Sequence, residues 1–306
     1  MTRLRAADAT AAAPRVFRCG RVAIVGRPNV GKSTLVNALV GARISITSRR
    51  PQTTRHRLLG ILTTPDAQFI FVDTPGFQTE HRSPFNERMN RAVRQSLTDV
   101  DVIVLVLEAV RLDAADHSIL ALLPPDVPVI AAVNKVDRLA DRAQVLPYLS
   151  DVSSLRDFAA LVPISAEKGW QLEALLGEIG KQLPAGDPRY AKDELTDRDE
   201  RFLAAEYIRE KIFRQLGADV PYAATVTIET FEHKAGLRRI GATVYVDKAS
   251  QRAILVGERG ERMKSIATAA RGEMERLFGG KVFLEVWVKV KSGWAADERI
   301  LTQLGY

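Results

Sequence analysis

The chain has little cysteine and no long apolar run. Its 306 residues include one cysteine, Cys19, so an intramolecular disulfide is excluded and a reducing, cytoplasmic setting is expected. No stretch approaches the ~18 consecutive apolar residues that span a bilayer. Residues 1–15 carry arginines but lack the apolar core of a secretion signal. They are expected to form a flexible tail, which we favour over an organellar transit peptide.

Basic residues are in only moderate excess over acidic residues. Lys and Arg total 44 and Asp and Glu total 37, which gives a formal net charge of +7. This balance favours affinity for polyanions. The length suits two domains that each bury a core.

A glycine-bounded loop has the pattern of a phosphate-binding P-loop. Residues 26–33 read G-R-P-N-V-G-K-S, between an apolar run at 22–25 and a helical pattern at 34–40. This strand, loop and helix order is the context the motif requires. Backbone N–H groups and the helix N-terminus would bind phosphate, Lys32 would reach the β- and γ-phosphates, and Ser33 would ligate Mg²⁺. The predicted phosphate-binding residues are Gly26, Arg27, Pro28, Asn29, Val30, Gly31, Lys32, Ser33 and Thr34.

A second motif, Asp73-Thr74-Pro75-Gly76, follows the apolar run at 69–72. A carboxylate at a strand end suits the Mg²⁺ site, where we expect Asp73 to act through water. The Gly76 N–H would contact the γ-phosphate only while that phosphate is present. All four residues are assigned to the nucleotide site.

An N-K-x-D motif identifies the base. Asn134, Lys135 and Asp137 follow an apolar run at 128–133. Asp137 can accept hydrogen bonds from N1–H and the exocyclic amine of guanine, and adenine offers neither donor. Asn134 can tie this loop to the P-loop, while the Lys135 stem lies on the base.

A further strand-end motif, Ser165, Ala166 and Glu167, follows residues 160–164. The Ala166 backbone N–H is expected to contact guanine O6. In this order after a P-loop, the motifs predict a guanine nucleotide site for GTP or GDP.

The polar segment at residues 49–57 would alone indicate a solvated basic loop. Its place between the P-loop and Asp73 is where a GTPase keeps the segment that closes over Mg²⁺ and the γ-phosphate. We predict Thr54, rather than Thr53, as the metal ligand. Lys32, Thr54 and Gly76 are the predicted catalytic residues, and residues 81–90 form the expected second mobile region.

Phe77 stands where Ras-like enzymes place the glutamine that orients the attacking water. A phenyl ring cannot orient water by hydrogen bonding, so slow intrinsic hydrolysis is expected. Asn29 either ligates K⁺ beside the phosphates or stabilises the turn of its own loop, and the sequence leaves both open.

A domain boundary is expected where Pro184-Ala185-Gly186-Asp187-Pro188 ends a helical apolar pattern. We assign residues 16–184 to the first domain, 185–200 to a linker and 201–306 to the second domain. The predicted fold class is α/β, with a mainly parallel sheet in the first domain and a smaller α/β unit after it.

The second domain has an RNA-binding pattern. A helix is expected at 202–209, strands at 224–231 and 242–247, and a further strand at 254–256 that leads into a G-x-x-G loop and a helix. The KH module uses such a loop to clamp about four nucleotides of single-stranded RNA. The predicted RNA-binding residues are Gly257, Glu258, Arg259, Gly260, Arg262 and Lys264, with the basic residues offsetting Glu258.

Residues 281–291 alternate like a strand. One face is apolar and consists of Val282, Leu284, Val286, Val288 and Val290. Phe283 and Trp287 lie on the other face. These aromatic rings could stack on bases, although packing under a helix or on the first domain is favoured.

Together these motifs resemble the Era family of bacterial GTPases from about residue 16 to residue 306. Its pattern is carried by residues 26–33, 51–57, 216–222 and 288–295. The resemblance implies a Ras-like domain joined to a type II KH domain, and a GTPase that acts in small ribosomal subunit assembly. It also implies GTP-dependent binding to the 3′ end of 16S rRNA and peripheral association with the inner membrane. A monomer is expected.

Two alternative functions would use the same two domains. One is a GTPase of another RNA-processing or tRNA-modification pathway. The other is a GTP-gated RNA-binding protein in which hydrolysis is incidental.

Overall fold

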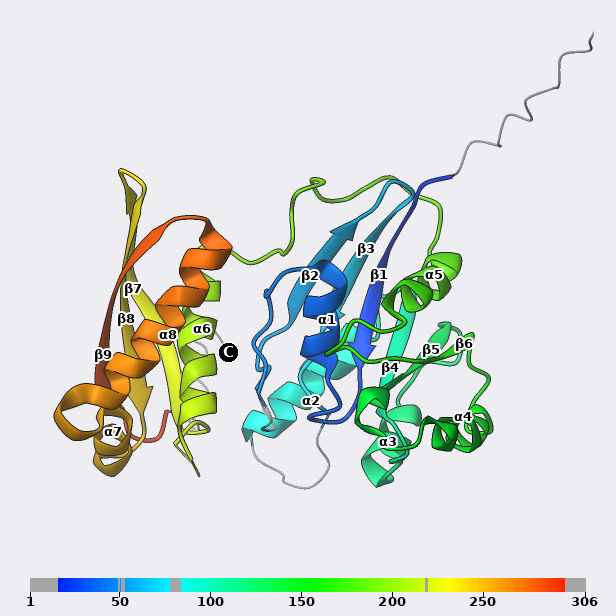
Figure 1. The fold of residues 1–306 in the computed structure, drawn as a ribbon, viewed down its shortest axis with the longest axis horizontal. Coiled ribbons are helices and arrows are strands. Elements are labelled where there is room, and N and C mark those ends of the chain that lie inside the picture. Colours follow the sequence, from blue (N-terminus) through cyan, green and yellow to red (C-terminus); the bar gives the residue numbers. More distant parts are fainter. Residues whose placement is uncertain (1–15, 49, 51–52, 78–83, 218–219, 295–306) are drawn as a thin grey trace, which may run out of the picture.

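The computed structural model describes residues 16–48, 50, 53–77, 84–217 and 220–294. Within these residues the chain forms two α/β units, one around a six-stranded sheet and one around a three-stranded sheet (Figure 1). The segment that connects them runs along the first unit and then crosses to the second (Figure 1). The predicted α/β class and the mainly parallel first sheet are confirmed.

The six-stranded sheet has the order β2-β3-β1-β4-β5-β6, in which only β2 runs antiparallel to its neighbour. Its strands are β1 (Arg18–Val25), β2 (Leu58–Thr63), β3 (Ala67–Asp73), β4 (Val102–Glu108), β5 (Val129–Asn134) and β6 (Ala160–Pro163). The described helices of this unit are α1 (Lys32–Val40), α2 (Pro84–Ser96), α3 (Ala114–Leu120), α4 (Val145–Ser153) and α5 (Leu172–Gln182), with 3₁₀ turns at Val136–Arg138 and Arg142–Gln144.

Helices cover both faces of this sheet. Helices α1 and α5 pack with one set of strand side chains, and α2, α3 and α4 pack with the other. Strands buried on both sides read as continuous apolar runs, which is why their sequence showed no alternation. The parallel strands end at one edge of the sheet, where ligands of such folds bind. The loops after β1, β3, β5 and β6 carry the predicted nucleotide motifs.

The three-stranded sheet has the order β7-β8-β9, with β7 and β8 antiparallel and β8 and β9 parallel. Its strands are β7 (Ala224–Lys234), β8 (Leu237–Val246) and β9 (Lys281–Val290). The helices are α6 (Glu200–Gln215), α7 (Ala249–Val256) and α8 (Glu261–Phe278), and a 3₁₀ turn spans Glu258–Gly260. Apolar side chains of all three helices pack on the same face of this sheet.

One local prediction was wrong. Residues 254–256 end helix α7 rather than form a strand, because a run of three or four apolar residues fits a buried helix as well as a strand. Helix α2 begins at Pro84, so residues 84–90 of the expected second mobile region are helical. The helix buries Met89 and Val93, and Leu97 is buried directly after its last residue. The mobility of this region stays a prediction. Residues 81–83 of that segment lie outside the described part of the chain.

The predicted linker pairs with the first sheet. Gly186 N donates to Phe17 O at 3.1 Å, and Leu195 O accepts from Ile61 N at 2.9 Å. Between them, Gln68 Oε1 accepts from the backbone N–H of Arg189 at 2.7 Å. The connection is therefore hydrogen-bonded to the first unit before it enters α6. None of the helices in the described ranges is long and apolar enough to cross a bilayer.

Candidate guanine nucleotide site

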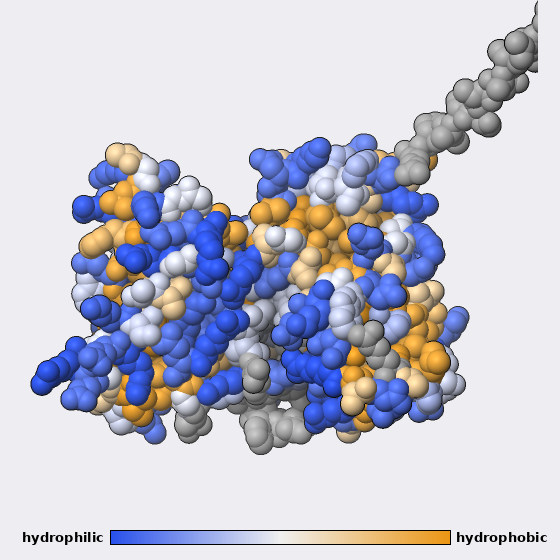
Figure 2. All heavy atoms as spheres, viewed as in Figure 1, coloured by the Kyte–Doolittle hydropathy of each residue, from blue (hydrophilic) through white to orange (hydrophobic). Residues whose placement is uncertain are grey.

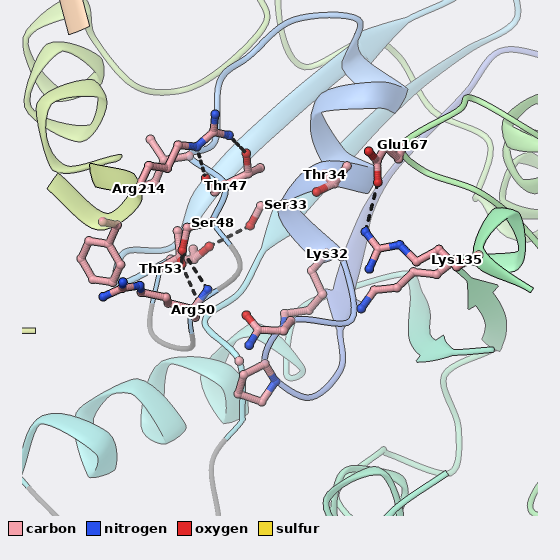
Figure 3. A pocket seen from close by; sticks show the side chains of 18 residues that line it. Lys32, Ser33, Thr34, Thr47, Ser48, Arg50, Thr53, Lys135, Glu167 and Arg214 are labelled. Atoms are coloured by element: carbon pink, nitrogen blue, oxygen red, sulfur yellow. Dashed lines mark hydrogen bonds and ion pairs between the residues drawn. The ribbon is translucent and has the colours of Figure 1, made fainter. Parts of the chain in front are cut away.

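A cavity of about 990 Å³ lies at the carboxyl edge of the parallel strands (Figure 3). Its walls come from the P-loop, from the segment between α1 and β2, from Gly76 and from the two base-recognition loops. Arg214 of α6 reaches it from the second unit. The fold therefore places motifs from residues 26 to 167 around one cavity.

Asn134 joins the P-loop to the two base-recognition loops. Its Nδ2 donates to Val30 O at 2.8 Å, and its Oδ1 accepts from Ala166 N at 2.9 Å. Gly31 has φ 106°, and a Cβ there would lie 2.3 Å from Asn134 Nδ2, so the second P-loop glycine is needed for this junction. The Ala166 N–H predicted for guanine O6 is already bonded to Asn134, and a bound guanine would share or displace that bond.

Lys32 begins α1 and its side chain is buried. Nζ donates to Gly26 O at 2.9 Å and to Arg27 O at 3.0 Å. Burial lowers the pKa of Lys32 to about 8, and Asp73 opposes that shift. The ammonium is held inside the loop that would wrap the phosphates, where bound phosphate oxygens would offset its desolvation.

The three predicted metal-site residues meet beside Lys32. Ser33 Oγ lies 2.8 Å from Thr54 Oγ1 and donates to Asp73 Oδ2 at 2.8 Å. Burial raises the pKa of Asp73, against hydrogen bonds from Ser45 and Ser33. Asp73 Oδ1 is buried and has no hydrogen-bond partner among the described residues. The site therefore offers two hydroxyls as direct ligands and a free carboxylate oxygen that could accept from a metal-bound water. This set fits Mg²⁺, which prefers oxygen ligands and keeps several waters.

This geometry agrees with the prediction of Thr54, rather than Thr53, as the metal ligand. Thr53 Oγ1 donates to Arg50 O at 2.7 Å and lies 2.6 Å from Ser48 Oγ, on the other side of the segment (Figure 3). Ser45, which the sequence reasoning missed, donates to Asp73 Oδ2 at 2.6 Å. No motif marks Ser45, because its role comes only from the fold.

Replacing Thr54 with alanine should weaken binding of a GTP analogue about 10-fold or more, while GDP binding stays within about twofold. The hydroxyl would be a metal ligand only when the γ-phosphate is present, and one hydrogen bond or ligand to a charged group is worth about 1.5–3 kcal/mol. Titration calorimetry with Mg²⁺ measures both affinities. Thr53→Ala is the matched control, and equal losses for the two nucleotides would contradict the assignment.

Two predicted binding residues use their side chains to support the site. Arg27 Nη2 donates to Glu108 Oε2 at 2.7 Å and its Nε donates to Asp116 at 3.2 Å, so two of its guanidinium nitrogens are directed to these carboxylates. Lys135 lines the cavity, and its Nζ donates to Glu108 Oε1 at 2.9 Å. Glu108 thereby connects the P-loop to the base loop. Its position at the end of β4 was the one available sequence signal.

The other first-domain predictions lie as follows. Asp137 is half-buried, and its carboxylate makes no hydrogen bond within the described part of the chain, which leaves it open to a base. Gly76 lies against Pro28, where a Cβ would come within 2.9 Å. Phe77 is buried among core side chains. Glu167 lines the cavity and accepts from Arg138 at 3.1 Å.

Three remaining site residues are buried in the same loops. The Thr74 hydroxyl donates to Ile24 O at 2.8 Å, which fixes the end of β3 against β1. Pro75 is buried beside it. Ser165 Oγ accepts from Lys168 N at 3.1 Å, so this side chain shapes the loop that Ala166 and Glu167 continue.

In the second unit, the G-x-x-G loop opens α8 beside a groove of about 510 Å³. Gly260, Lys264, Val286 and Val288 contribute to its walls. Gly257 has φ 72°, and a Cβ there would lie 2.7 Å from Arg262 Cβ. Glu258 and Arg259 are exposed in the loop, and Arg262 donates to Ile254 O at 2.6 Å.

The fold and this site define a class: a P-loop guanine nucleotide-binding protein with a C-terminal KH unit. A family model described as 50S ribosome-binding GTPase matches residues 21–135, and one described as KH domain matches residues 219–295. GTPase Era of Nitrosomonas eutropha is 54% identical over 95% of this chain and 98% of that protein. GTPase Era of Chromobacterium violaceum is 52% identical over 94% and 98%.

Two solved structures are similar over the whole length. One is Era in complex with MgGDPNP and nucleotides 1506–1542 of 16S ribosomal RNA, with TM-score 0.90, 36% identity and coverage of 95% of this chain and 99% of that one. The other is an Aquifex aeolicus Era variant bound to GDP and AlF4⁻, with TM-score 0.91 and the same identity and coverage. The chain belongs to the GTPase Era family, and it binds guanine nucleotide and hydrolyses GTP. The expected family resemblance is confirmed.

Proposed function

We propose that the protein acts in small ribosomal subunit assembly, where its KH groove binds the 3′ end of 16S rRNA while the first domain holds GTP. The related Era bound to nucleotides 1506–1542 of 16S ribosomal RNA and MgGDPNP supports this RNA and this nucleotide state. Hydrolysis to GDP and phosphate would then release the RNA.

The observation that carries GTP dependence is the contact between α6 and the Thr54 segment, by which we mean the described residues between α1 and β2. Glu210 accepts from Thr47 N at 3.1 Å, and Arg214 donates to Thr47 O at 3.0 Å. Arg209 donates to Thr53 O, directly before the predicted metal ligand. If this segment changes conformation when the γ-phosphate binds or leaves, its hydrogen bonds would therefore shift α6, the first helix of the KH unit.

A second set of contacts fixes the same interface. Arg55 donates to Ala224 O at 3.0 Å at the start of β7. Arg43 donates to Glu210 at 2.6 Å and to Glu273 of α8 at 2.7 Å. These contacts link both sides of the nucleotide segment to the helices that carry the RNA groove. If GTP strengthens RNA binding in this way, RNA must strengthen GTP binding by the same factor.

The catalytic proposal follows from the site geometry. P-loop N–H groups and Lys32 would hold the phosphates, and the Gly76 N–H would contact the γ-phosphate. Bound Mg²⁺ at Ser33, Thr54 and water on Asp73 would neutralise charge on the β- and γ-phosphates. Because Phe77 is buried in the core, it orients no water, and we propose slow intrinsic turnover.

Three finer properties complete the proposal. Asn29 lines the cavity with φ 66°, and its carboxamide is proposed to ligate K⁺ beside the phosphates. The net charge of +7 supports peripheral association of a cytoplasmic protein with anionic inner-membrane lipids. We propose that the protein acts as a monomer, which sedimentation analysis would test.

The RNA proposal is tested at Lys264, which is exposed on α8 at the groove wall. Hydrophilic side chains cover most of the visible surface over this helix (Figure 2). Lys264→Glu should lower affinity for a 16S rRNA 3′-end oligonucleotide about 10-fold or more, because a phosphate contact becomes a repulsion. GTP hydrolysis without RNA should not change. Lys181→Glu on the first domain is the control, and equal RNA affinity of the two variants would oppose the proposal.

A further inference from the structure

The face of the three-stranded sheet opposite α6 and α8 carries two exposed aromatic rings. Phe283 and Trp287 are 47% and 49% exposed. Their neighbours Val282, Leu284, Val286 and Val288 point to the other side, where they pack with the helices. The expectation that these rings pack under a helix or on the first domain was wrong, because the helices of the unit all use the other face.

The Trp287 ring is held against the sheet. Gly241 of β8 pairs with Glu285, and a Cβ at Gly241 would lie 3.2 Å from Trp287 Cζ3. The indole therefore lies against the β8 backbone at Gly241, where even an added Cβ would make a tight contact with it. One side of the ring is supported, and nearly half of the side chain faces solvent. Such a ring loses little freedom when a flat group stacks on it.

Cations lie beside other aromatic positions of this sheet face. Arg239 pairs with Phe283 across the strands, and its Cζ lies 5.6 Å from the ring centroid. Lys289 pairs with Tyr245, and Lys291 Nζ lies 5.7 Å from the Tyr245 ring. The one carboxylate between Phe283 and Trp287 on this side of β9 is Glu285. Aromatic planes interleaved with cations suit unpaired nucleotides, whose bases stack while their phosphates meet the charges.

The position of β9 connects this face to the KH groove. In the described sheet β9 is an edge strand. Val286 and Val288 line the G-x-x-G groove, Phe283 borders the same groove at the edge of β9, and Trp287 lies on the outer face. An RNA strand that leaves the groove needs only to pass the edge of β9 to reach the rings.

We propose that the outer sheet face, made of Arg239, Tyr245, Phe283, Trp287 and Lys289, is a second RNA-binding surface. It stacks unpaired bases of the same RNA strand whose neighbouring nucleotides occupy the G-x-x-G groove. This inference rests on the proposed RNA-binding function and extends its footprint beyond the groove.

The test compares two labelled oligonucleotides on the full-length protein with a GTP analogue bound. The short one has about four nucleotides, the length that a KH groove clamps. The long one keeps those nucleotides and adds about eight at each end. The variant Trp287→Ala, at a residue outside the groove lining, should weaken the long RNA about 10-fold and leave the short RNA unchanged. Lys264→Glu should weaken both.

Trp170, which is 39% exposed on the first domain, provides the matched control through Trp170→Ala. Quenching of Trp287 emission by the long RNA and not by the short one is the second readout. It is taken as the difference in emission between Trp170→Phe and the double variant Trp170→Phe, Trp287→Phe, because the buried Trp294 also emits. Equal affinities of wild type and Trp287→Ala for the long RNA would overturn the second surface while leaving the groove intact. Binding of neither RNA by wild type would instead refute the proposed function itself. A change in Trp287 emission with protein concentration, without RNA, would assign the face to a second copy and also overturn the proposal.

Discussion

Lys32→Met is expected to lower the affinity for both GDP and GTP by roughly 100-fold or more, because truncating one member of a buried charge pair costs about 2–5 kcal/mol. The variant keeps most of the apolar stem and removes the ammonium that donates to Gly26 O and Arg27 O. Titration calorimetry with each nucleotide measures the loss. Lys181→Met, at an exposed lysine of α5, is the control, and wild-type affinity of Lys32→Met would contradict the P-loop assignment.

The same variant should remove a pH dependence of stability in the nucleotide-free protein. Because the pKa of Lys32 falls from 10.5 to about 8 on folding, the unfolded chain holds this proton more tightly. Below pH 8 the folded state therefore bears a penalty of about 3 kcal/mol, and its stability recovers as pH rises from 8 toward 10.5. Urea unfolding at several pH values should show this rise in wild type and not in Lys32→Met. An identical profile in both would mean that the lysine is not desolvated.

Asp137→Asn is expected to lower GTP affinity by roughly a thousandfold, since two hydrogen bonds to a charged group are worth about 1.5–3 kcal/mol each. Xanthine carries a carbonyl where guanine has its exocyclic amine. An asparagine amide can donate to that carbonyl while its oxygen accepts from N1–H, so the variant should prefer xanthosine triphosphate. Competition between the two nucleotides for the bound site measures the preference.

Asp126→Asn makes the same chemical change at an exposed site of the first domain and should leave selectivity unchanged. Retained GTP preference in Asp137→Asn would refute the base assignment. The prediction rests on an open acceptor, because Asp137 makes no hydrogen bond with any residue that the structure describes.

The sequence predicted those features that depend on short spacing. A P-loop needs its glycines, lysine and serine within eight positions, so residues 26–33 were sufficient to place it. The strand-end motifs were equally local, and the parallel topology then had to bring them to one edge. The convergence of Ser33, Thr54 and Asp73 follows from that edge.

The features that the sequence did not predict depend on distant partners. Arg27 reaches Glu108 and Asp116, which lie 81 and 89 residues further along the chain. No local pattern distinguishes such an arginine from one that binds phosphate. The helix at 249–256 was missed because its last residues form a short apolar run without a visible period. The Trp287 ring lies against Gly241, which belongs to another strand.

The most direct test of a GTP-gated RNA switch is fluorescence anisotropy of a labelled 16S rRNA 3′-end oligonucleotide, titrated with protein bound to GDP or to a GTP analogue. A scrambled oligonucleotide is the control. The hydrogen bonds from the Thr54 segment to α6 predict tight, sequence-selective binding with the analogue and weak binding with GDP. Equal, salt-sensitive binding of both oligonucleotides in both nucleotide states would contradict the account.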